Sequence, residues 1–165
     1  MQLQLEIKKN FRSDDNRFIY NKAFKYLRTP TNIWADLKKE FNFTLDCCAS
    51  SENHLLPRYH TQETDTLKQS WENEIAYIHP MFDGKIGKFV EKAYHTKNFI
   101  GVFLLPASTH TKYFHDFIYH NPNCEIRFLR KPNRGFHFGH DDGTADDPNA
   151  LGYLKPLMIV IFRNK

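Results

Sequence analysis

The sequence predicts an α/β protein in which helices flank a mostly parallel sheet. Strand-like segments alternate along the chain with helices of ten or more residues, a pattern typical of this class. The segment from Phe99 to Leu105 is apolar except for Gly101 and ends at Pro106, as a central strand buried on both faces should. A chain of 165 residues corresponds to about one domain. We therefore expect a single domain, residues 1–165, built around this sheet.

The first half of the chain supplies one predicted helix and two predicted strands. Thr31 follows a proline and is a plausible N-cap for a helix whose apolar stripe is Ile33, Trp34, Leu37 and Phe41. Residues 42–48, with the sequence NFTLDCC, predict a short buried strand. A second strand is expected over Ile75 to Ile78, and the proline at position 80 stops it.

The second half supplies the remaining predicted elements. After Gly84 the apolar residues recur at helical spacing; they are Ile86, Phe89, Val90, Ala93 and Tyr94. A further helix is expected over residues 110–120, and further strands over 124–129 and 157–162. Residues 1–20 are expected to form an N-terminal extension. Residues 131–155 contain four of the seven glycines, so we expect a long and mobile loop there.

Composition narrows the class of protein without naming a function. Hydrophobic residues make up 41% and aromatic residues 15%, which excludes a disordered chain. No apolar run approaches the ~20 residues that span a bilayer, and the first ten residues do not resemble a secretory signal. Three cysteines favour a reducing compartment, so we expect a cytoplasmic protein. The net charge of +4 is compatible with an anionic partner.

Two segments follow predicted strands, where open α/β sheets bind their ligands. Asp46 is followed by small residues and can bind a ribose or an ammonium group, or it can simply form a turn beside a buried cysteine. In the second segment, His79 and Pro80 precede Phe82, which can stack on a flat ring or join the core. No GxGxxG or P-loop motif occurs, which excludes the glycine-dependent phosphate cradles.

Ordered blocks over most of the chain resemble the DNA N6-adenine methyltransferases carried by bacteriophages and prophages. The blocks are Thr29-Pro30 with Trp34 and Leu37; Leu45 to Ser50 with Asn53, Arg58, Tyr59 and Thr61; Asp65, Leu67 and Trp71; Ile86 to Ala93; Leu104 to Ala107 with Thr109, Thr111 and Phe114 to Asp116; Ile126 to Leu129; Arg134 to Phe136 with Phe138-Gly139; and Met158 to Phe162. The resemblance implies a Rossmann-like class I methyltransferase sheet and S-adenosylmethionine as cofactor.

The resemblance also implies a site and a substrate. Asp46, Ala49 and Ser50 would line the methionine part of S-adenosylmethionine, with Pro30 closing over it. Asp65 would hold the adenine moiety, or else it is the N-cap of a helix ahead of Thr66. The acceptor would be the N6 amino group of adenine in DNA, and Phe82 would stack on the flipped base.

One position departs from the family's pattern. The family carries Asn or Asp followed by Pro-Pro-Tyr, whereas this chain has His79-Pro80-Met81-Phe82. In the family, the Asn or Asp side chain and a backbone carbonyl accept hydrogen bonds from the adenine amino group. Neutral His79 has one acceptor nitrogen that can replace the carboxamide oxygen, and Pro80 keeps its carbonyl. A misplacement of about 1 Å can cost a hundredfold in rate, so activity depends on this turn.

Four basic residues near the predicted loop would hold DNA through its phosphates; they are Arg127, Arg130, Lys131 and Arg134. Solvated surface arginines are the other interpretation. Two further functions remain open. A methyltransferase fold with an altered turn can serve as a DNA- or protein-binding module. His137, His140, Asp141 and Asp142 can instead form a metal site of a hydrolase, although we predict no metal.

Overall fold

The computed structural model describes residues 27–133, 136–140 and 153–165. The predicted extension over residues 1–20 and part of the predicted loop over 131–155 lie outside these residues. None of the described helices is long and apolar enough to cross a membrane.

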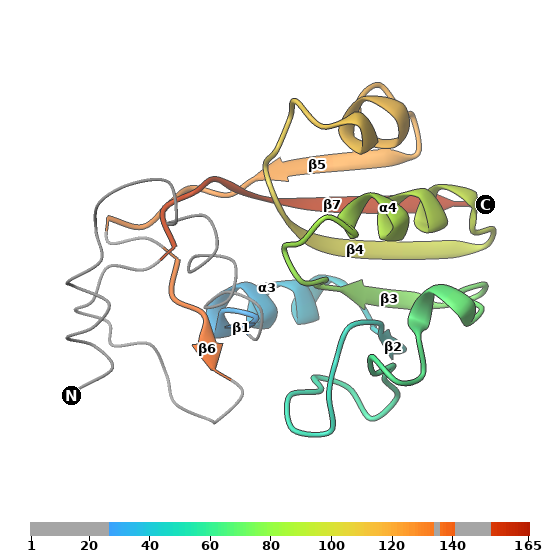
Figure 1. Ribbon diagram of the computed structural model, residues 1–165, viewed down its shortest axis with the longest axis horizontal. Coiled ribbons are helices and arrows are strands. Elements are labelled where there is room, and N and C mark those ends of the chain that lie inside the picture. The colour runs from blue at the N-terminus through green and yellow to red at the C-terminus, as the bar shows by residue number, and fades with distance from the viewer. Residues whose placement is uncertain (1–26, 134–135, 141–152) are drawn as a thin grey trace.

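The main sheet has five strands in the order β2-β3-β4-β7-β5 (Figure 1). Their bounds are Leu45–Asp46 for β2, Ile75–Ile78 for β3, Phe99–Pro106 for β4, Cys124–Phe128 for β5 and Leu157–Asn164 for β7. β2, β3 and β4 pair in parallel, whereas β7 pairs antiparallel with both β4 and β5. The α/β class is therefore confirmed, with one reversed strand in a sheet that otherwise runs in one direction.

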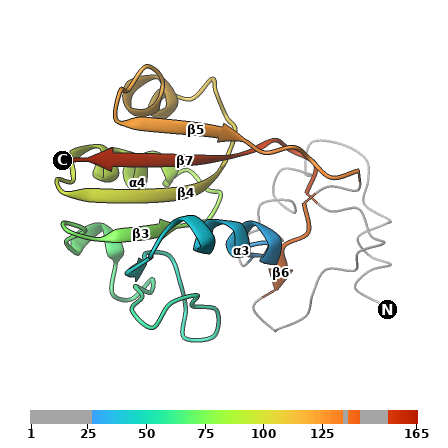
Figure 2. The ribbon, with the colours of Figure 1, turned by 180° about the vertical axis from the view of Figure 1, so that it is seen from behind.

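Helices cover both faces of this sheet (Figures 1 and 2). α4 (Ile86–His95) lies on one face, and the π-helix η2 (Phe114–Ile118) packs beside it. α3 (Thr31–Glu40) lies on the opposite face, which Figure 2 shows from behind. Each face has its own hydrophobic core, so the central strands are apolar on both sides.

Two local predictions are confirmed only in part, and one was wrong. Of the predicted strand 42–48, only Leu45–Asp46 forms β2, although the N–H groups of Thr44 and Cys47 still bond the carbonyls of Ile75 and Tyr77 in β3. The predicted helix over 110–120 is shorter in the structure, with helical residues 112–118 that include η2, because turns and bends occupy residues 107–111. α3 begins at Thr31 with Pro30 as its N-cap, so Thr31 does not cap the helix.

A second, two-stranded sheet pairs β1 (Leu27–Arg28) with β6 (Gly139–His140). Besides β6, the described parts of the predicted loop 131–155 contribute side chains to the hydrophobic core. Phe136, Phe138 and Tyr153 are buried in the core on the α3 face, and Phe136 and Tyr153 form an isolated antiparallel bridge. Aromatic side chains thus attach this segment to the sheet.

Close packing around Gly101 in β4 predicts a sharp effect of one added methyl group. A Cβ at Gly101 would lie 2.4 Å from the ring of Phe99, which is buried and stacked on Trp71. We expect Gly101→Ala to lower the free energy of unfolding by roughly 1–3 kcal/mol, because the ring has no room to move. Chemical denaturation measures this.

Gly84→Ala is the matched control for this prediction, because a Cβ there meets nothing within 4 Å. Its unfolding free energy should stay within about 0.5 kcal/mol of the wild type. Equal destabilisation by both substitutions would contradict the packing argument.

Candidate active site

Two cavities lie side by side along the edge of the sheet where β2, β3 and β4 end. The larger has a volume of about 720 Å³ and the smaller about 620 Å³. Phe82, Asp83 and Lys88 line both, so the turn after β3 separates the two cavities. Both volumes fall in the range of small-molecule sites, roughly 300–1,000 Å³.

The larger cavity brings together six of the predicted site residues: Ala49, Ser50, Asp65, His79, Pro80 and Phe82. The remainder of its wall comes mainly from the segments that follow β2 and from the turn after β3. The lining includes Glu52, Asn53, Glu63, Leu67, Met81, Lys85 and Phe89. The lining of the larger cavity therefore combines carboxylates, an amide and apolar side chains.

Asp46 and Pro30, two predicted cofactor residues, do not line this cavity. The carboxylate of Asp46 accepts hydrogen bonds from the backbone N–H groups of Cys48 (3.3 Å) and Leu55 (3.0 Å). Burial raises the pKa of Asp46, while these two donors partly oppose the shift. Through these two hydrogen bonds, Asp46 therefore fixes the backbone of the loop over 47–55. Pro30 is buried and its carbonyl accepts the N–H of Trp34 in the first turn of α3.

Asp65 lines the larger cavity and also occupies the N-cap position of the 3₁₀ helix η1 (Thr66–Lys68). Its side chain makes no capping hydrogen bond and pairs instead with Lys68 at 3.1 Å. Its backbone is left-handed, with φ of 47°, a conformation that Asp adopts more readily than most residues. Both sequence interpretations of Asp65 thus fit its position, since it precedes the helix and faces the cavity.

The turn after β3 is enclosed by aromatic rings. The ring of His79 lies 5.5 Å from that of Phe82 and 5.9 Å from that of Phe138, measured between centroids. Its Nδ1 lies 3.1 Å from the hydroxyl oxygen of Thr29, which is 2.7 Å from that of Tyr77. Phe82 is only partly buried and contacts both hydrophobic cores.

These apolar surroundings make His79 neutral at physiological pH. Burial lowers the pKa of His79 to about 4, from an ordinary value of 6.5. A neutral imidazole has one donor and one acceptor nitrogen. Because Nδ1 is engaged with Thr29, Nε2 is the ring nitrogen left for a ligand.

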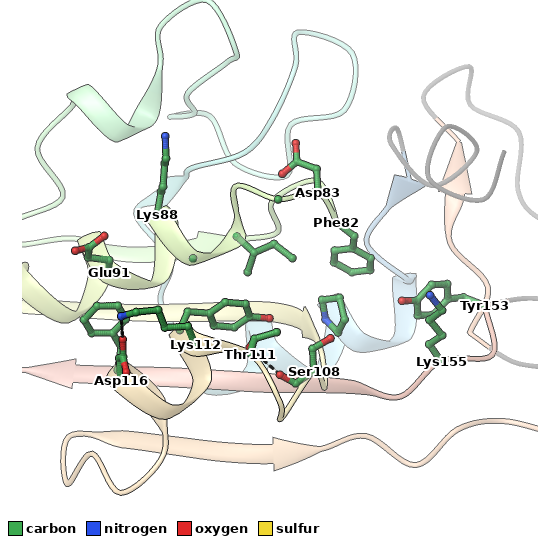
Figure 3. Close-up of a pocket in the computed structure, with 16 residues that line it drawn as sticks. Phe82, Asp83, Lys88, Glu91, Ser108, Thr111, Lys112, Asp116, Tyr153 and Lys155 are labelled. Carbon is green, nitrogen blue, oxygen red and sulfur yellow. Dashed lines mark hydrogen bonds and ion pairs between the residues drawn. The ribbon is translucent and has the colours of Figure 1, made fainter. Parts of the chain in front are cut away.

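The smaller cavity lies between α4 and the segment that follows β4 (Figure 3). Ser108 and Thr111 face it and are joined by a hydrogen bond from the Thr111 hydroxyl to the Ser108 carbonyl. Lys112 pairs with Asp116 on one side, and Lys155 lies beside Tyr153 on the other. Its lining thus combines side chains of both charges with apolar ones such as Ile86 and Phe117.

The three described residues of the predicted DNA-binding set differ in their surroundings. Arg127 makes hydrogen bonds to both carboxylate oxygens of Glu40, at 2.6 and 2.7 Å, and to Glu125 at 2.5 Å. These partners raise the pKa of Arg127 and occupy its guanidinium group. Arg130 and Lys131 are exposed beyond the end of β5. Arg134 lies outside the described residues.

Neither a nucleophilic cysteine nor a metal site gains support from the described residues. Burial raises the pKa of both Cys47 and Cys48, so both are thiols rather than nucleophilic thiolates. Within residues 27–133, 136–140 and 153–165, no three side chains of His, Cys, Asp or Glu form a group that could hold a metal. Asp141 and Asp142 of the candidate metal cluster lie outside these ranges.

Several residues that line the cavities were missed from the sequence. Lys85 and Lys88 flank the start of α4, and their position on the polar side of a predicted amphipathic helix was the available signal. Glu63 and Tyr153 carry no such signal, because no periodicity places their segments near the turn after β3. Lys112 and Lys155 likewise reach the smaller cavity only through the tertiary fold.

An α/β sheet with ligand-sized cavities at the carboxyl ends of parallel strands is typical of proteins that bind nucleotide-like molecules. A family model described as DNA N-6-adenine-methyltransferase (Dam) matches residues 21–165, and the chain belongs to this family. Searches of curated proteins and of solved structures found no significant match. Family membership implies activity on adenine in DNA.

The low pKa of His79 predicts a loss of stability in acid. Below pH 6.5 the unfolded chain takes up a proton at this histidine, which the folded protein does not bind until about pH 4. Relative to His79→Asn, the wild type should therefore lose up to about 3 kcal/mol of unfolding free energy between pH 7 and pH 4.

Urea denaturation of both proteins at a series of pH values checks this. All other titrating groups are the same in the two proteins, so their effects cancel in the difference. If the difference in unfolding free energy between the wild type and His79→Asn stays constant with pH, folding does not lower the pKa of His79. His95→Asn provides the control, since this histidine is exposed.

Proposed function

We propose that the protein transfers a methyl group from S-adenosylmethionine to the N6 amino group of adenine in DNA. The observation that carries the proposal is the position of the His79–Phe82 turn. This turn stands between two ligand-sized cavities at the carboxyl edge of the sheet, in a chain of the Dam family. The sheet would then be a Rossmann-like class I methyltransferase sheet.

The residues of the larger cavity fit S-adenosylmethionine, which carries cationic, hydroxyl and aromatic parts. Glu52, Glu63 and Asp65 offer carboxylates to an ammonium group or ribose hydroxyls, and Leu67 and Phe89 offer apolar surface to a ring. Ala49 and Ser50 would hold the methionine part, with Asp46 fixing the loop that carries them. When bound there, S-adenosylmethionine supplies an electrophilic methyl group.

The turn after β3 would hold the target base. Phe82 would stack on the flipped adenine, since its ring is partly exposed where the two cavities meet. The described residues make no hydrogen bond to the carbonyl oxygen of Pro80, which leaves it available to the adenine amino group. Transfer would break the methyl–sulfur bond of the sulfonium and form the methyl–nitrogen bond, and the proton that the amino group loses would pass to solvent.

The first test is methyl transfer from labelled S-adenosylmethionine to unmethylated DNA, followed by nucleoside digestion and mass spectrometry. We expect N6-methyladenine above a no-enzyme control from the wild type. His79→Asn should raise the rate by roughly tenfold to a hundredfold, because it introduces a carboxamide oxygen that can accept a hydrogen bond from the adenine amino group. His95→Asn is the matched control and should leave the rate unchanged.

Folded protein that transfers no methyl group to single- or double-stranded DNA, with or without His79→Asn, would overturn the proposal. DNA binding by that inactive protein would then favour the alternative, a binding module on a methyltransferase fold. Cofactor binding can be followed separately by calorimetry with S-adenosylmethionine.

The exposed positions of Arg130 and Lys131 lead us to expect that both residues contribute to the salt dependence of DNA binding. They lie exposed at the carboxyl edge of the sheet, beyond β5, whereas Arg127 is held by Glu40 and Glu125. The double variant Arg130→Gln, Lys131→Gln should weaken DNA binding several-fold and lower the slope of log K against log salt by about 1–2. Fluorescence anisotropy over a salt series measures both.

Lys97→Gln, Lys165→Gln removes the same charge at the opposite edge of the sheet, where β4 begins and β7 ends. That control should keep the wild-type slope. An equal fall in both double variants would indicate a nonspecific effect of net charge.

A further inference from the structure

Three polar groups form a hydrogen-bonded chain that ends at the candidate catalytic turn. The hydroxyl oxygens of Tyr77 and Thr29 are 2.7 Å apart, and Thr29 Oγ1 is 3.1 Å from Nδ1 of His79. Tyr77 and His79 lie on the same face of the chain, because they are two residues apart at the end of β3. Thr29, which directly follows β1, reaches both side chains from that face.

The surroundings of this hydrogen-bonded chain limit which groups can accept its hydrogens. Tyr77 is 1% exposed, and burial raises its pKa, so its hydroxyl keeps its hydrogen. The rings of Phe82 and Phe138 pack against His79 and offer no conventional acceptor. Among the described residues, Thr29 is the hydrogen-bond partner of both Tyr77 and Nδ1.

The chain can run in two directions, or Thr29 can accept from both neighbours, which leaves its own hydroxyl hydrogen without an acceptor among the described residues. In the first, Tyr77 donates to Thr29 and Thr29 donates to Nδ1, so the histidine hydrogen is on Nε2. In the second, Nδ1–H donates to Thr29 and Thr29 donates to Tyr77, whose own hydroxyl hydrogen then finds no acceptor among the described residues. Leaving a buried donor unsatisfied is costly, so the first direction is favoured.

We propose that Thr29 is a positioning residue that holds His79 in the tautomer with its hydrogen on Nε2. The ring then presents a hydrogen-bond donor, and not an acceptor, to the larger cavity that it lines. This differs from the acceptor role that the sequence suggests for His79.

The consequence for the substrate rests on the proposed function. Adenine places a ring nitrogen acceptor on each side of its amino group, at N1 and N7. With the amino group on the Pro80 carbonyl, His79 Nε2–H would donate to one of these ring nitrogens. Guanine presents N1–H and a carbonyl oxygen on its corresponding edge, so the Pro80 carbonyl and an N1-directed Nε2–H would oppose it. Where it donates to N1, His79 thereby selects adenine over guanine, whereas N7 is an acceptor in both bases.

The tautomer can be measured directly, without any activity. Long-range ¹H–¹⁵N correlation spectra of the full chain at pH 7 distinguish a protonated from an unprotonated ring nitrogen, and His79→Asn assigns the signals. We expect the wild type to show protonated Nε2 and unprotonated Nδ1. Thr29→Val should shift both nitrogens toward intermediate values, and Thr29→Ser should restore them.

Thr31→Val is the matched control, because it makes the same change at an exposed residue nearby and should leave the His79 signals unaltered. A wild type with protonated Nδ1, or a Thr29→Val variant with the wild-type tautomer, would overturn the proposal. If Thr29 had only a structural role, a folded Thr29→Val variant would keep the wild-type tautomer of His79. A change of tautomer in the folded variant therefore distinguishes the two roles.

Substrate analogues test the donor role separately. Single-stranded DNA with 1-deazaadenine or 7-deazaadenine in place of adenine lacks one ring nitrogen each. For the wild type we expect one of the two to lower kcat/KM by roughly tenfold. The loss should be smaller in Thr29→Val. Equal rates with adenine and both analogues would refute donation to the base. If no variant methylates any DNA, the proposed function fails, while the spectra still decide the role of Thr29.

Discussion

The pairing of β4 with β7 is the constraint on which the rest of the molecule depends. Eight residue pairs align these strands, from Phe99 with Asn164 to Pro106 with Leu157. Their side chains alternate between the two hydrophobic cores: Phe103 and Val160 point to the α4 face, whereas Val102 and Ile161 point to the α3 face. A slip of one residue would exchange the faces of every side chain, so two cores together fix one register.

The candidate active site follows from this arrangement by simple geometry. β3 pairs in parallel with β4, so both strands end at the same edge, and the chain that leaves each strand lines a cavity there. The alternation of β3 continues into the turn and places Tyr77 and His79 on one face. That face is the one covered by α3 and by Phe138, which explains why His79 enters an aromatic environment.

Sequence reasoning succeeded where a residue's role depends on its neighbours along the chain. Hydrophobic continuity located β4 and β7, helical spacing located α4, and Pro80 marked the turn that divides the cavities. It failed where distant segments compete for the same groups. The link from Arg127 to Glu40 joins residues 87 positions apart, and the contact of Thr29 with His79 spans 50. No local pattern contains such information.

A histidine at position 79 is compatible with this fold because of the side chains that surround it. Burial beside aromatic rings keeps the imidazole uncharged, so the cavity wall gains no positive charge there at neutral pH. A neutral ring still has two nitrogens with opposite roles, and Thr29 engages one of them. The chemistry available to the turn is therefore decided by the direction of the hydrogen bonds between Tyr77, Thr29 and His79, which are set before any substrate binds.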